Sequence, residues 1–232
     1  MIENKKVLAI TLARGGSKRV PKKNISVIEG KPLIQYTIDE VKKSNLIDRY
    51  IISSDDDDVI HLATDLNCEI HKRSQKNSSD VATSASAIQE VLNDIRSDYD
   101  YVVEIMCTNP LKTIEDIDGV IKKLHETGSD SVVSVVRVWD HHPSRIKFIK
   151  DDKLIDVYPE IPESRRQDLD PPAFIRNGSV YAFTLDSFKK CKNRLGPDTK
   201  PYIMPEERSI NIDEKYDLEL AKIIIRDLKK KL

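Results

Sequence analysis

Residues 7–12, VLAITL, run directly into residues 13–24, ARGGSKRVPKKN. A short apolar run bounded by glycines predicts a buried strand that leads into a loop. Such loops line the ligand crevice at the carboxyl ends of parallel strands, and glycine N–H groups can approach a phosphate that Arg and Lys neutralise. The stretch therefore predicts a phosphate-binding loop, with a solvated basic loop as the alternative. It matches neither the Walker A motif nor G-x-G-x-x-G.

The rest of the chain alternates between short apolar runs and helical stripes. Strands that alternate with helices of about 10–15 residues indicate βαβ units and a mostly parallel sheet, so the expected fold class is α/β. Continuous apolar runs fit parallel strands, which are buried on both faces. Beyond the first strand, we expect strands at residues 50–54, 69–70, 101–106, 131–136 and 178–183, and helices at 32–44, 59–66, 85–95, 114–125 and 216–232.

The pattern changes between residues 139 and 172, which are polar and rich in proline. Proline removes a backbone donor and clashes with the preceding turn, so no long helix is expected there. Residues 146–149 and 154–157 are apolar runs separated by the charged residues 150–153, which predicts a hairpin. We interpret this segment as an arm that leaves the sheet.

Composition narrows the class of protein. The 232 residues suit one α/β domain, and the net charge of −1 gives no overall field for nucleic acid or an anionic membrane. Cys68, Cys107 and Cys191 are far apart and show no C-x-x-C spacing, so we expect neither zinc nor a disulfide framework. No stretch has the length of a signal-peptide core or a membrane span. These observations predict a cytoplasmic protein without nucleic-acid or membrane partners.

Residues 12–24 resemble a specific family signature. LARGGSKRVPKKN is similar to the ARxGSKxxPxKN motif of the N-acylneuraminate (CMP-sialic acid) cytidylyltransferases, and the resemblance continues to the end of the chain. It implies a doubly wound α/β nucleotidyltransferase core, residues 1–136 and 176–232, with an inserted dimerisation arm, residues 137–175. It also implies a homodimer and a reaction in which CTP and a nonulosonic (sialic-acid-like) sugar acid give the CMP-sugar and pyrophosphate.

The resemblance assigns roles for nucleotide binding. Arg14 and Lys23 would hold the triphosphate and act in catalysis, while Arg73 and Ser84 would meet the cytosine and its surroundings. The residues alone leave another interpretation of the second stretch open, because Ser79 and Asp80 with Ser84 are also typical of a helix N-cap. The remaining nucleotide contacts implied in the loop are Ala13, Gly16, Ser17 and Asn24.

The implied sugar-binding residues depart from the family pattern in places. Residues 106–112, MCTNPLK, lie where the family has QPTSPLR, so Met106 replaces the glutamine expected to bond the sugar and Lys112 replaces an arginine. Met106 is equally suited to the core. In FIRNG, residues 174–178, the family arginine is displaced from Ile175 to Arg176, and whether Arg176 substitutes is open. The other implied sugar contacts are Thr108 and Asn177.

Residues 163–169, ESRRQDL, resemble the RRQD motif of the arm. The implied role is to reach the active site from the arm, within the chain or across a dimer, where an arginine fork can bind the sugar carboxylate. A solvated basic turn is the alternative. The residues concerned are Arg165, Arg166 and Gln167, of which Arg166 is also a catalytic candidate.

A metal site is implied near the C-terminus. Residues 209–213, SINID, resemble the family's S-I-D-I-D, and strand alternation would put Asn211 and Asp213 on one face. Such oxygen ligands suit Mg²⁺, the expected cofactor. Asp55 is a further candidate, although the run from Asp55 to Asp58 also suits the start of a helix, which is the interpretation we favour.

Three alternatives for function remain at this stage. The same chemistry can act on legionaminate, pseudaminate or a Kdo-like acid. Asn211 and Met106 also permit a catalytically weak nucleotide-binding or regulatory homologue. A GT-A-type glycosyltransferase lacks support, because residues 56–58 fit the D-x-D pattern only as part of an acidic run. No serine or cysteine stands beside a histidine as a covalent nucleophile would, so direct displacement is the expected mechanism.

Overall fold

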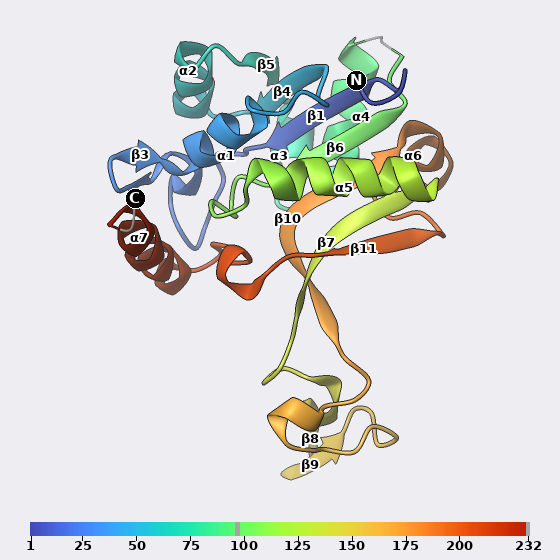
Figure 1. The fold of residues 1–232 in the computed structure, drawn as a ribbon. Coiled ribbons are helices and arrows are strands. Elements are labelled where there is room, and N and C mark those ends of the chain that lie inside the picture. Colours follow the sequence, from blue (N-terminus) through green and yellow to red (C-terminus); the bar gives the residue numbers. More distant parts are fainter. Residues whose placement is uncertain (96–97, 231–232) are drawn as a thin grey trace.

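The computed structural model describes residues 1–95 and 98–230, and β1 (Val7–Leu12) lies inside its main sheet (Figure 1). The seven strands lie in the order β11-β7-β10-β6-β1-β4-β5. All neighbouring pairs are parallel except those made by β10, which runs antiparallel to both β6 and β7. The other strands are β4 (Arg49–Ser54), β5 (Glu69–Lys72), β6 (Tyr101–Ile105), β7 (Ser131–Arg137), β10 (Phe174–Thr184) and β11 (Thr199–Ile203).

Helices cover both faces of this sheet, as alternation along β1 shows. Val7 and Ala9 pack in a core cluster with α5, whereas Leu8 and Ile10 pack with α4 and α6 on the opposite face. All four side chains are fully buried, which explains why the strand is a continuous apolar run. The expected α/β, doubly wound, mostly parallel fold is confirmed. The helices are α1 (Leu33–Val41), α2 (Asp57–Asp65), α3 (Gln75–Ser78), α4 (Ser84–Ile95), α5 (Ile114–Thr127), α6 (Leu185–Cys191) and α7 (Lys215–Lys229).

The strand order creates a switch point beside β1. The chain passes from β1 to β4 and then β5 on one side, and returns to β6 on the other side. In open α/β sheets, ligands bind outside the carboxyl ends of the strands at such a point. The loop after β1 and the residues that follow β6 are therefore brought together at one edge of the sheet.

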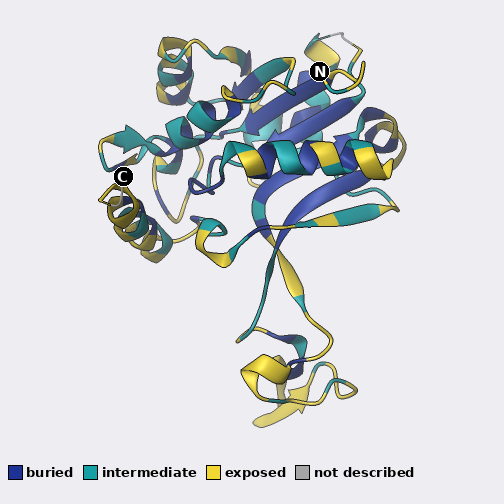
Figure 2. Cartoon of the chain, in the orientation of Figure 1, coloured by how far each residue is buried: buried dark blue, intermediate teal, exposed yellow. Residues whose placement is uncertain are grey.

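An arm extends from the sheet between β7 and β10 (Figure 1). It ends in the hairpin of β8 (Lys147–Lys150) and β9 (Lys153–Asp156), and Figure 2 shows much of this hairpin exposed. Asp151 and Asp152 both have positive φ, the backbone of a tight hairpin turn. The predicted hairpin is confirmed, with each strand displaced by one residue. The division into a core and an arm of residues 137–175 stays a prediction.

Several local predictions need correction. SINID is not a strand: residues 209–213 are an extended link between the short η4 helix (Glu206–Arg208) and α7. Its backbone makes isolated hydrogen bonds, such as the one from Ile212 N–H to the Thr108 carbonyl (2.8 Å), and does not form the regular hydrogen-bond ladder of a strand. The end of the predicted C-terminal helix, residues 231–232, lies outside the described residues. The elements that the sequence did not predict include α3, α6, β11 and the small pair β2 (Val27–Ile28) and β3 (Lys31–Pro32).

Among residues 1–95 and 98–230, no helix combines the length and the apolar character that crossing a bilayer requires.

Candidate active site

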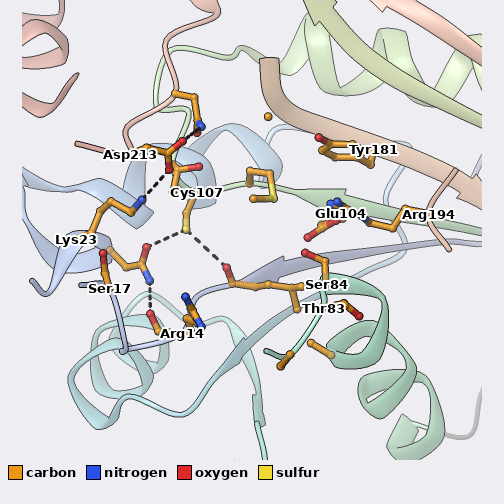
Figure 3. Close-up of a pocket in the computed structure, with 18 of the residues that line it drawn as sticks. Arg14, Ser17, Lys23, Thr83, Ser84, Glu104, Cys107, Tyr181, Arg194 and Asp213 are labelled. Atoms are coloured by element: carbon orange, nitrogen blue, oxygen red, sulfur yellow. Dashed lines mark hydrogen bonds and ion pairs between the residues drawn. The ribbon is translucent and has the colours of Figure 1, made fainter. Parts of the chain in front are cut away.

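A cavity of about 710 Å³ opens at the carboxyl ends of β1 and β6 (Figure 3). This volume lies in the range of small-molecule sites. Basic residues of the β1 loop line one part, and residues from β6, β10 and the segment after α6 line another. The predicted site residues found in its wall are Arg14, Ser17, Lys23, Asn24, Arg73, Ser84, Met106, Thr108, Asn211 and Asp213, and Arg176 joins them.

The loop after β1 is held close to the start of α2. Gly15 N–H donates to Asp55 Oδ1 (3.0 Å), and a Cβ at Gly15 would come within 2.7 Å of Asp56 Oδ2, so a larger residue would displace the Asp56 side chain. Asn24 Nδ2 donates to the Arg14 carbonyl (2.9 Å) from inside the loop. Asp56 caps α2 by accepting from Asp58 N–H, which supports the helix-start interpretation of the acidic run. Asp55 and Asn24 therefore shape the loop.

The loop cations are paired with carboxylates at the rim. Arg14 Nη1 donates to the Ser79 carbonyl (3.0 Å) and lies 3.4 Å from Asp80 Oδ1, and Lys18 also pairs with Asp80. The Lys18 ammonium holds the pKa of Asp80 below its usual value. Exposed pairs of this kind contribute little to stability. A triphosphate, with several negative charges, can therefore replace Asp80 as the partner of Arg14 and Lys18.

Lys23 connects this loop to the C-terminal segment. Its Nζ donates to the Ile212 carbonyl (2.6 Å) and lies 3.3 Å from Asp213 Oδ1. The lysine is mostly buried, with 12% of its side chain exposed, so its position is well defined. It is thus a fixed positive charge beside the proposed metal residues.

The proposed base pocket is anchored on β4. Arg73 is buried and donates from Nη2 to the Ser53 carbonyl (2.6 Å) and from Nε to Ser53 Oγ (3.1 Å), and burial lowers its pKa. Ser84 begins α4, and Thr83 Oγ1 accepts from Ser86 N–H (3.1 Å). The cap of α4 is therefore Thr83, and the N-cap interpretation of Ser79 and Asp80 is wrong because these residues lie one turn too early.

The side chain of Met106 lies partly in the core and partly in the cavity wall. It packs against the buried cluster of Val133, Val135 and Tyr181, and it also lines the cavity. Arg176 lines the cavity too, whereas Ile175 is exposed. The displaced arginine of FIRNG is thus placed where it can face a ligand.

Other predicted residues do not line the cavity of this chain. Ala13 is fully buried, and Gly16 is not among the lining residues. Asn177 is a buried bridge that accepts from Ser134 Oγ (2.7 Å) and donates to Ser209 Oγ (2.9 Å). Its polar groups are therefore used to connect β10 with the segment before Asn211.

The arm motif also lies away from this cavity. It forms the short helix η3 (Arg166–Asp168), where Arg165 Nε donates to Asp168 Oδ2 (2.6 Å). The Arg166 guanidinium lies over the Trp139 ring, 5.4 Å from its centroid. Arg165, Arg166 and Gln167 are exposed, and none lines the cavity.

Asn211 and Asp213 lie side by side in the cavity wall. Asn211 Nδ2 donates to Asp213 Oδ2 (2.6 Å), and Asn211 Oδ1 is buried without a hydrogen-bond partner among the described residues. Those residues contain no group of three or more His, Cys, Asp or Glu able to hold a metal. Mg²⁺ commonly uses only one or two protein carboxylates together with phosphates and water, so this oxygen pair fits it.

The cavity-wall residues that the sequence did not predict include Glu104, Tyr181 and Arg194 (Figure 3). Glu104 could have been found from the sequence, because a carboxylate inside the apolar run of residues 101–106 requires a buried partner. The partner, Arg194, lies ninety residues away in an irregular segment. No local pattern points to it.

A cationic loop after the first strand and a cavity at the switch point of an α/β sheet define a nucleotidyltransferase. Residues 8–184 match the family model described as cytidylyltransferase. The chain belongs to the cytidylyltransferase family, and it is an enzyme of the nucleotidyltransferase type.

Individual relatives agree with this assignment. The chain is similar to the pseudaminic acid cytidylyltransferase of Campylobacter jejuni, with 30% identity over 95% of this chain and 97% of the relative. It is 32% identical to the N-acylneuraminate cytidylyltransferase B of Danio rerio, over 92% of this chain and 50% of that protein. The fold resembles that of a CMP:2-keto-3-deoxy-manno-octonic acid synthetase complexed with CTP, with a TM-score of 0.75, 16% identity, and 96% of this chain and 99% of the other covered.

Proposed function

We propose that this cytidylyltransferase couples CTP to a nonulosonic sugar acid and releases pyrophosphate. One observation carries the proposal: a single cavity joins the basic β1 loop to a second wall of hydrogen-bonding groups, among them Glu104, Tyr181 and Arg194. The first part suits a triphosphate, and the second suits a polyhydroxylated sugar. The relatives named for pseudaminic acid and N-acylneuraminate support this class of acceptor.

The loop residues supply the electrostatics of the transfer. Arg14 and Lys23 would hold the triphosphate, with Ser17 at the loop and Arg73 and Ser84 around the cytosine. The anomeric hydroxyl oxygen of the sugar acid attacks the α-phosphorus of CTP, the bond to the β-phosphate oxygen breaks, and the hydroxyl proton is lost to solvent. Fixed cations stabilise the charge that builds on the phosphates, and binding both substrates in one cavity aligns the reacting atoms.

The proposed Mg²⁺ site consists of Asp213 and Asn211. Their oxygens would hold the ion together with phosphate oxygens and water. The ion would neutralise negative charge on the triphosphate. In this arrangement Lys23 stabilises the phosphates next to the ion, since its Nζ lies 3.3 Å from Asp213 Oδ1.

The arm supports a homodimer. Its hairpin exposes Phe148, Ile149 and Leu154, with 62%, 78% and 73% of each residue accessible. Apolar side chains grouped on a projecting hairpin indicate a contact surface. Arg165 and Arg166 do not reach the cavity of their own chain, so we assign them to the carboxylate of the sugar acid in a second copy. A cytoplasmic location stays a prediction from the sequence.

The test is a pyrophosphate-release assay with CTP, UTP, ATP and GTP against a panel of nonulosonic acids. We expect release with CTP and one or more acids of the panel, among them N-acetylneuraminate and pseudaminate. Equal rates with UTP would refute the base assignment. Failure of every acid, with Kdo active in its place, would show that the acceptor class is wrong.

A further inference from the structure

A buried ion pair lies in the cavity wall opposite the phosphate loop. Glu104 is fully buried in β6, and its Oε2 accepts a hydrogen bond from Arg194 Nη1. The Arg194 guanidinium lies over the ring of Tyr181, 4.1 Å from its centroid. Tyr181 is the β10 residue directly opposite Glu104 in the sheet register. All three residues line the cavity, and Figure 3 shows them together beside Ser84.

This cluster leaves hydrogen-bonding capacity unused. Glu104 Oε1 is buried and has no partner among the described residues. A guanidinium has five N–H donors, and the hydrogen bond to Glu104 is the one found for Arg194 in the described part of the chain. Arg194 keeps 20% of its side chain exposed, so its remaining donors can meet a ligand. An unpaired buried carboxylate oxygen is costly, and such groups in a cavity point to a missing partner.

The net charge of the Glu104–Arg194 pair limits which chemical groups can bind beside it. Glu104 neutralises Arg194, so this pair offers donors and an acceptor with little net charge. At the loop, in contrast, the one carboxylate that pairs with both Arg14 and Lys18, Asp80, is exposed and easily replaced. The neutral pair therefore suits a neutral polar substituent, and the loop suits the triphosphate. A carbonyl oxygen is the stronger neutral acceptor for a guanidinium donor.

We propose that Arg194 is a specificity-determining residue that donates to the carbonyl oxygen of an acylamino substituent on the sugar acid. Glu104 is its positioning residue, which holds the guanidinium by charge, and Tyr181 supports it from the other side. This inference rests on the proposed function and adds the part of the sugar that is recognised. It also assigns a selective role to residues far from the phosphates.

The test compares two acceptors with several variants. The acceptors are an N-acylated nonulosonic acid that the wild type uses and its analogue with a hydroxyl in place of the acylamino group. The variants are Arg194→Gln, Arg194→Lys and Glu104→Gln, with kcat and KM measured for each acceptor and for CTP. Arg208→Gln is the matched control, since Arg208 also pairs with a buried carboxylate, Asp116 (2.8 Å), but lies outside the cavity.

We expect Arg194→Gln to raise KM for the acylated acid about tenfold or more, because a site built to bond a polar group discriminates strongly against its loss. The change in KM for the hydroxyl analogue and for CTP should stay within about twofold. Glu104→Gln should raise KM for the acylated acid with little change in kcat, and Arg194→Lys should recover only part of the loss. Arg208→Gln should leave all three KM values, for the two acceptors and for CTP, unchanged.

Two results would overturn the inference. An equal rise of KM for both acceptors would show that Arg194 does not recognise the acylamino group. A rise of KM for CTP with an unchanged KM for the acid would place the pair at the cytosine. If the wild type turns over no nonulosonic acid, the proposed function itself fails, which is a distinct outcome.

Discussion

Replacement of Lys112 by methionine should change how the stability of this protein depends on pH. Lys112 is almost fully buried below the residues that follow β6. Its Nζ donates to Thr37 Oγ1 (2.7 Å), to the Met106 carbonyl (2.7 Å) and to the Asn109 carbonyl. Burial lowers the pKa of Lys112 from 10.5 to about 7. The ammonium is therefore stabilised less in the folded protein than in water.

The sign of the effect follows from proton binding. The unfolded chain holds a proton on Lys112 up to about pH 10.5, whereas the folded protein releases it near pH 7. Between these values the unfolded state binds more protons, so the free energy of unfolding rises with pH. One pKa unit corresponds to about 1.4 kcal/mol, so Lys112 contributes a rise of roughly 2–3 kcal/mol from pH 7 to pH 9.

Methionine keeps an unbranched chain of similar size but removes the charge and the donors. Two carbonyls then lose their partner, at a cost of roughly 1–3 kcal/mol each. At pH 9 this loss dominates and Lys112→Met should be clearly destabilising. At pH 6 relief of the buried charge offsets the loss, so the two proteins should be closer in stability.

The measurement is urea unfolding followed by circular dichroism at pH 6, 7, 8 and 9, for the wild type and Lys112→Met. The difference in the free energy of unfolding should grow with pH above pH 7. Lys189→Met, at an exposed lysine of α6, controls for the loss of a lysine as such. A difference for Lys112→Met that is constant, or that shrinks as pH rises, would refute the buried-charge reasoning.

Three further predictions concern the site and the arm. Lys23→Ala should lower kcat roughly a hundredfold or more, because it removes a preorganised charge; steady-state kinetics on the folded variant check this, and a near-normal kcat would exclude the role. Asn211→Asp should lower the Mg²⁺ concentration for half-maximal rate, since a hard cation gains from each carboxylate, and Asp213→Ala should nearly abolish activity; an unchanged midpoint together with an active Asp213→Ala would place the metal elsewhere. Phe148→Asp should convert the proposed homodimer to monomer in light scattering, because it puts a charge into the apolar hairpin surface; a wild type that is already monomeric would remove the basis of the arm assignment.

Local patterns were enough to predict six of the seven strands of the main sheet and the cationic loop after β1. The run of residues 7–12 is apolar at every position except Thr11, as a strand covered on both faces requires. The loop that follows carries its glycines and cations within twelve positions, so its chemistry is visible without any long-range contact. The family resemblance added the reaction class and the pair Asn211 and Asp213, which do line the cavity.

Pairings between distant segments were decided only by the tertiary structure. Alternation in residues 209–213 suggested a strand, but a strand also needs a neighbouring strand. The backbone there instead makes one hydrogen bond to Thr108 and one to Lys23. The position of Glu104 in an apolar run predicted a buried partner, but the sequence did not show that this partner is Arg194. Likewise, Lys23 contacts Asp213, which lies 190 positions away in the chain. Sequence spacing describes which side chains share a face of one element. Which faces then meet depends on strand order and on the packing of helices across the sheet, because these bring residues together that no local period relates.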